Sequence, residues 1–153
     1  MAVFVQLDKL GEVVEQAGHF RAKCETELDE STKHIYDACS ELTNATREIF
    51  STAMEWNIAW HHRFSFKAEQ NGSVEKNDAI DAEAAAKNIF FEAVGVFKIK
   101  QTYTCMVYDT YDFAFKRHAM AATAFVAAKV EYDRALEMAK QWPQDPDASS
   151  RRD

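Results

Sequence analysis

The chain has 153 residues, of which 47% are hydrophobic and 28% charged, with only four Gly, two Pro and a formal net charge of -7. This composition is too apolar for a disordered chain and too poor in turn-forming residues for a sandwich or barrel of many short strands. The acidic balance disfavours direct binding to nucleic acid or to anionic membranes, because both require a basic face. We therefore expect one domain built from a few long helices.

The first predicted helix covers about residues 6–66 and carries an apolar seam in alternating steps of three and four. Two rows of different size make up the seam. The large row holds Leu7, Val14, Leu28, Ile35, Leu42, Ile49 and Trp56, and the small row holds Ala17, Cys24, Ser31, Ala38, Ala45, Thr52 and Ala59. Small residues let a neighbouring helix approach closely, as in a coiled coil, while large residues fill the space beside it.

A polar turn is predicted over about residues 67–77, where the pair Asn71-Gly72 interrupts the apolar register. The second helix follows over about residues 78–142, with Asn77 or Asp78 as its cap. Its predicted seam is largely aromatic and consists of Phe90, Val94, Phe97, Gln101, Thr104, Tyr108, Tyr111, Phe115, His118, Ala122, Phe125, Lys129, Tyr132, Leu136 and Ala139. Residues 143–153 contain both prolines and are expected to form a disordered tail after a single helical domain over residues 1–142.

The predicted fold is all-α, an antiparallel hairpin of two long amphipathic helices. A lone hairpin has a thin core, so we expect self-association into a four-helix assembly, most simply as a homodimer. The alternative is a compact up-down four-helix bundle with breaks near residues 29–32 and 109–112, where weak helix formers lie. In the hairpin, residues at one level have numbers that sum to about 144, which places Cys39 level with Cys105.

Two clusters are candidate sites for binding another protein. The first is aromatic and cationic and contains Trp56, Trp60, His61, His62 and Arg63. It offers rings for stacking and histidines for pH sensitivity, although its tryptophans would also serve simply to cover the seam. The second is the acidic run Glu25, Glu27, Asp29 and Glu30, which would either attract a basic partner or form a solvated helix face.

No motif for catalysis or metal binding stands out. Glu15 and His19 share a helical face, but neither Glu-x-x-His nor His-Glu-x-x-His occurs in the chain. His118 lies on the second seam, and the chain offers no Gly-rich loop, Ser elbow or paired carboxylates. We interpret it as a hydrogen-bonded core histidine. The sequence thus predicts no enzyme, no catalytic residue, no metal and no cofactor.

Three cysteines, without a CxxC pair, fit a reducing compartment, and the N-terminus lacks the features of a signal peptide. We therefore expect a cytoplasmic protein without a membrane association. The leading hypothesis is a non-enzymatic interaction, structural or inhibitory protein that binds another protein of unknown identity. Two alternatives are a helical-bundle module for a small hydrophobic ligand, haem-like cofactor or metal, and an amphipathic coat on lipid or polymer granules.

Overall fold

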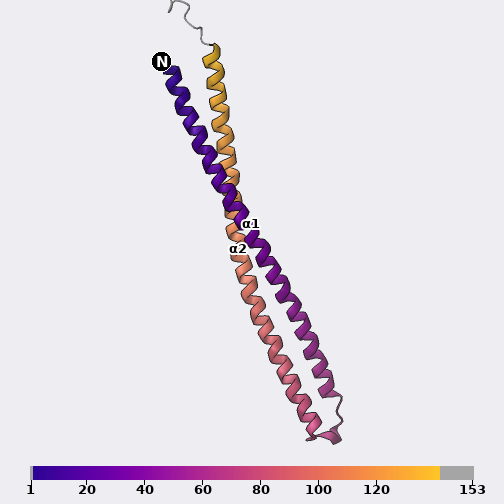
Figure 1. The fold of residues 1–153 in the computed structure, drawn as a ribbon. Helices are drawn as coiled ribbons and strands as arrows, with labels where there is room; N and C mark the ends of the chain where they lie inside the picture. Colours follow the sequence, from indigo (N-terminus) through magenta and orange to yellow (C-terminus); the bar gives the residue numbers. More distant parts are fainter. Residues whose placement is uncertain (1, 142–153) are drawn as a thin grey trace, which may run out of the picture. The chain divides into compact units, whose positions relative to one another are not determined.

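The computed structural model describes residues 2–141 and consists of two long helices. Helix α1 (Ala2–Phe64) and helix α2 (Val74–Gln141) are joined by a turn that contains the short 3-10 helix η1 (Ala68–Gln70). They pack against each other as an all-α hairpin without strands among the described residues, which confirms the predicted fold class (Figure 1). Within this range no helix has a stretch apolar enough to cross a membrane. The predicted tail, residues 143–153, lies outside it.

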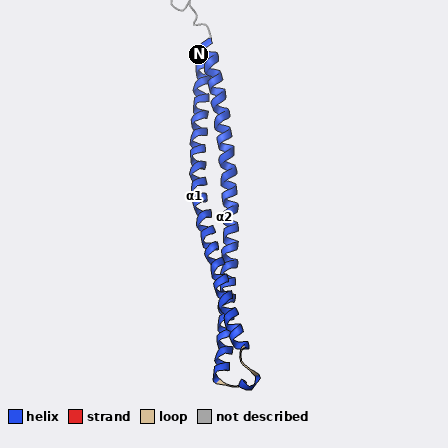
Figure 2. Ribbon diagram, turned by 90° about the vertical axis from the view of Figure 1, so that its right-hand side faces the viewer, coloured by secondary structure: helices blue, strands red, loops and turns tan. Residues whose placement is uncertain are grey.

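The packing divides into two units. Unit 1 contains residues 1–30 and 112–153, and unit 2 contains residues 31–111 with the turn. Both helices run without interruption through these boundaries, as the continuous ribbons of α1 and α2 show (Figure 2). The breaks near residues 29–32 and 109–112 do not form, so the alternative of four shorter helices is wrong.

Hydroxyl side chains explain part of this continuity. Threonine is a weak helix former partly because its hydroxyl competes for backbone groups. Here Thr110 Oγ1 donates a hydrogen bond to the carbonyl oxygen of Met106 at 3.1 Å, one turn earlier. Thr52 makes the same bond to the carbonyl of Glu48 at 2.8 Å. The hydroxyl is thereby satisfied within the helix, and Ser31, at the other predicted break, is buried in the interface.

The predicted seam of α1 is its buried face. Every predicted position of the two rows, from Leu7 to Ala59, is buried or half-buried. The most buried members all belong to the small row, namely Cys24, Ser31, Ala38 and Thr52. The large row is only half-buried, because the close approach of α2 leaves room at the centre of the interface for small side chains alone.

The predicted seam of α2 is correct for one row and partly wrong for the other, in which Val94, Ala122 and Leu136 are half-buried. The row through Phe90, Phe97, Thr104, Tyr111, His118, Phe125 and Tyr132 is half-buried as predicted, but Gln101, Tyr108, Phe115 and Lys129 of the second row are exposed. Residues one position earlier take their place, and most members of that row are alanines. The small row of α2 is Ala79, Ala86, Ala93, Lys100, Val107, Ala114, Ala121, Ala128 and Ala135, and Ala79, Ala93, Ala114 and Ala121 are buried. Both helices therefore approach each other through small residues in steps of seven.

Contacts in unit 1 define the register there. A Cβ added to Gly18 would lie 3.4 Å from the Cε2 atom of Phe125, which is van der Waals contact, so the two residues are neighbours across the helix pair. On α2 the guanidinium Nη1 of Arg117 lies 2.8 Å from Oε2 of Glu27. The numbers of these two pairs sum to 143 and 144, in agreement with the predicted hairpin register.

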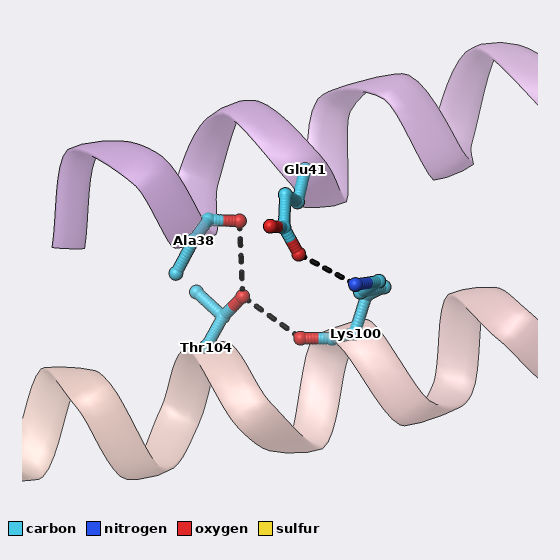
Figure 3. Close-up of polar contacts among 4 residues, drawn as sticks. All are labelled: Ala38, Glu41, Lys100 and Thr104. Carbon is cyan, nitrogen blue, oxygen red and sulfur yellow. Dashed lines mark hydrogen bonds and ion pairs between the residues drawn. The ribbon is translucent and has the colours of Figure 1, made fainter. Parts of the chain in front are cut away.

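Contacts in unit 2 give nearly the same register. Thr104 Oγ1 donates to the carbonyl oxygen of Ala38 at 3.4 Å and also to that of Lys100 at 2.8 Å (Figure 3). The ammonium group of Lys100 lies 2.5 Å from Oε2 of Glu41 on the other helix. These interhelical pairs have numbers that sum to 142 and 141.

The turn is shifted towards the N-terminus of its predicted position. Gly72 has a φ of 84°, a left-handed conformation that glycine adopts without steric cost, which supports the predicted Asn-Gly turn. Ser73 Oγ then accepts a hydrogen bond from the backbone N–H of Lys76 at 3.2 Å. Ser73 is therefore the cap of α2, and Asn77 and Asp78, predicted as caps, lie inside its first turns.

The first prediction tests the small rows by over-packing. Ala121→Leu should lower the free energy of unfolding by about 1–3 kcal/mol, because no room exists for a larger side chain where the backbones approach. Ala119→Leu, two residues away on the exposed face, should change it by less than about 0.5 kcal/mol, since leucine is also a good helix former. Urea denaturation followed by circular dichroism measures both. Equal losses would contradict the assigned interface.

The second prediction tests the register of unit 2. Cys39 and Cys105 each follow a residue of the Thr104–Ala38 hydrogen bond, and both thiols are exposed and free. A short bis-maleimide should therefore join them within one chain. Cys24 is buried and should stay unmodified in the folded protein. Peptide mapping by mass spectrometry identifies the linked cysteines, and a product that joins Cys24 to Cys39 would contradict this register.

Candidate functional site

The predicted aromatic cluster lies beside the turn in unit 2 and centres on Trp56. Its ring is half-buried in the large row of α1, with its centroid 5.3 Å from that of Phe90 and 6.1 Å from that of Phe91. Tilted aromatic pairs of this kind add about 0.5–1.5 kcal/mol to the area that they bury. Trp56 therefore serves to cover the seam. We call the group Trp56, Trp60, Arg63, Glu83, Phe90 and Phe91 the tip cluster.

A buried carboxylate lies at the base of the tip cluster. Glu83 is 8% exposed and stands seven residues before Phe90, in the row that is otherwise largely aromatic. Trp56 Nε1–H donates to its Oε1 at 3.4 Å, and the Arg63 guanidinium pairs with its Oε2. The hydrogen bond from Arg63 is the largest cause that lowers the pKa of Glu83 below its ordinary value of 4.5. Glu83 is thus a charged core residue whose charge Arg63 balances.

Trp60 presents the exposed side of the tip cluster. Its centroid lies 4.6 Å from that of Phe64, and the two side chains are 42% and 62% exposed. A hollow of about 300 Å³ lies beside Trp60 and is lined by Ala53, Trp56, Asn57, Trp60 and Phe90. Exposed aromatic rings beside a hollow are typical anchors for a protein partner.

The predicted site residues divide between the interface and the surface. Arg63 turns inward to Glu83, whereas His61 lies edge-on to Trp60 with centroids 4.9 Å apart and stays exposed. His62 is also exposed. Sequence reasoning missed Glu83 as a member of this site. Its signal was available, since Glu83 precedes the predicted seam position Phe90 by seven residues and so extends that row.

The acidic run in unit 1 does not act as one patch. Glu25, Asp29 and Glu30 are exposed, but Glu27 is half-buried and paired with Arg117. The guanidinium carbon of Arg117 also lies 5.4 Å from the ring centroid of Phe20. Glu27 therefore belongs to the interface between the helices, and three carboxylates remain for a basic partner.

The other candidate groups show no assembled chemistry. Glu15 and His19 form an exposed contact at 3.6 Å, as their spacing predicted. Among residues 2–141 no three side chains of His, Cys, Asp or Glu gather closely enough to hold a metal ion. His118 Nε2 is shielded from solvent and has no hydrogen-bond partner there, so the predicted hydrogen-bonded core histidine is wrong at this nitrogen.

The third prediction concerns Glu83 and pH. Because its folded pKa is lowered, its carboxylate contributes stability above the unfolded pKa, and this contribution is lost as pH falls through the folded pKa. Glu83→Gln should therefore melt below the wild type at neutral pH, and the two should converge as the pH falls below 4.5 and through the lowered pKa of Glu83. Thermal melts across this range measure the difference. Glu92→Gln, at an exposed position, is the control, and a Glu83→Gln gap that is independent of pH would contradict the assignment.

Comparison with known proteins gives no relative from which a role could be transferred. No protein-family model, no curated protein and no solved structure matches the chain.

Proposed function

We propose that this chain is a non-enzymatic helical protein that holds other protein chains against the apolar side faces of its helices. The supporting observation is an inverted pattern of burial. Among the side chains that the structure describes, the buried apolar ones are those of Cys24 and of alanines, whereas Tyr36 and Met120 are more than 70% exposed. Exposed apolar surface on this scale usually marks an interface, because leaving it in water is unfavourable.

The tip cluster supports the same function. The rings of Trp60, Phe64 and Phe91 are large and exposed. Near them, Arg63 and Trp56 of α1 contact Glu83 of α2 and so join the two helices. Tryptophan and arginine are enriched among residues that dominate binding energies. Self-association is one form of this function, with a homodimer as the simplest product. We further propose a cytoplasmic setting, in which the three free cysteines stay reduced.

A small-ligand module is the second candidate, favoured by the hollow in the tip cluster. Its volume of about 300 Å³ is at the lower end for ligand sites, and Trp56, Trp60 and Phe90 would stack on a planar apolar molecule. Quenching of tryptophan fluorescence by such ligands distinguishes this candidate. Saturable quenching that Trp60→Ala abolishes would favour it over protein binding.

The fourth prediction tests protein binding at the tip. Trp60→Ser with Phe64→Ser should reduce the proteins captured by the immobilised chain, or its dimer fraction, while leaving the helical content unchanged, because both side chains are exposed. Asn44→Ser with Thr123→Ser, two exposed polar positions away from the tip cluster, is the matched control. Quantitative mass spectrometry and sedimentation velocity measure the two readouts. A wild-type chain that stays monomeric and captures no protein would contradict the proposed function.

A further inference from the structure

An apolar stripe runs along α2 in unit 2 and is not used in packing against α1. It consists of Ile89, Val96, Ile99, Tyr103 and Met106, which share one helical face by their steps of seven, three, four and three. Each is between 48% and 70% exposed. Ile99, Tyr103 and Met106, with Lys98 and Thr102, line a shallow hollow of about 410 Å³. We call these five apolar residues the docking stripe.

A row of glutamates on α1 borders the docking stripe. Lys100 lies between Val96 and Tyr103 along α2 and reaches across to Glu41, so this side of α2 faces Glu41 (Figure 3). Glu48 and Glu55 follow Glu41 at steps of seven, which places all three carboxylates on the same face of α1. All three are exposed. We call them the glutamate ridge.

One of the three carboxylates of the glutamate ridge is paired with a lysine of the same chain. Lys100 belongs to the small row of α2 and pairs with Glu41 at 2.5 Å. In the same antiparallel register, Glu48 and Glu55 stand opposite the two earlier members of that row, which are Ala93 and Ala86. The chain thus supplies a lysine to the first carboxylate and an alanine to each of the other two. Because alanine has a short side chain, the space beside Glu48 and Glu55 is left open for the cations of a partner.

We propose that the docking stripe and the glutamate ridge together bind an amphipathic helix of another protein with basic residues seven positions apart. Its apolar row would lie on the docking stripe, and its two cations would pair with Glu48 and Glu55 as Lys100 pairs with Glu41. Apolar burial supplies the affinity in this mode of recognition, and the charges select the partner and its orientation. This inference rests on the proposed protein-binding function and names the class of partner.

A second copy of the chain fits the ridge poorly. The sequence contains no two Lys or Arg residues separated by seven positions, so no helix of a second copy can supply matched cations to both Glu48 and Glu55. A copy that docked through the same face would also bring its own glutamate ridge into the interface. Like charges brought together in this way disfavour association.

The fifth prediction uses two three-heptad helical peptides with one apolar row in common. One carries Lys at the two ridge-facing positions and the other carries Glu. Fluorescence anisotropy with the full chain should show the Lys peptide binding about tenfold more tightly at about 50 mM salt, with a smaller ratio at higher salt, because exposed charge pairs are screened. Glu48→Lys with Glu55→Lys should reverse the preference.

Two further variants separate the contributions. Asp81→Lys with Glu131→Lys makes the same change in charge at exposed positions away from the docking stripe and should leave the preference intact. Ile99→Ser with Met106→Ser should weaken both peptides. Equal binding of the two peptides would overturn this inference while protein binding through the apolar face stands. A wild-type dimer that binds neither peptide and becomes monomeric in the Ile99→Ser, Met106→Ser variant would identify a second copy as the occupant and also overturn it.

Discussion

Helices α1 and α2 meet through alanine, serine, cysteine and threonine, and the volume of these side chains determines where every larger residue lies. A heptad row of small residues on each helix brings the backbones close together, as Ala38 and Ala121 show by their nearly complete burial. Large side chains then have no place at the centre. They flank the interface, half-buried, or point away from it, as Tyr36 and Met106 do. The exposed apolar surface proposed for binding is thus a direct consequence of the close packing.

The tip cluster is the exception to this rule, because a large polar group lies in the core there. Glu83 occupies a position equivalent to Phe90 and Phe97 and is satisfied by Trp56 and Arg63 from the other helix. Removing one partner of such a group leaves a buried charge without compensation, so the group tolerates few alternative pairings. Polar contacts therefore specify the register next to the turn, where the apolar rows alone would accept neighbouring registers.

The sequence analysis succeeded where apolar periodicity and side-chain size agreed. On α1 the small row and the large row were both predicted correctly, because few competing apolar residues flank them. On α2 aromatic residues occur on several faces, and Tyr108 and Phe115 drew the predicted seam away from Val107 and Ala114. Hydrophobicity alone ranks an aromatic residue above alanine, whereas close packing requires the reverse. The step of seven to Phe90 places Glu83 on the seam, but its partners Trp56 and Arg63 come from the other helix, and the sequence alone does not pair them.

The heptad repetition of the small rows has a consequence for chain length. Each step of seven on α2 from Ala79 to Ala93, and again from Ala114 to Ala135, presents another alanine to α1. Within these two stretches the interface therefore repeats as similar modules, each with one alanine from α2. Removal or duplication of a matched heptad in both helices would restore the same packing on either side of the change. The length of the two helices can therefore change during evolution by whole heptads, while the turn and the tip cluster stay unaltered.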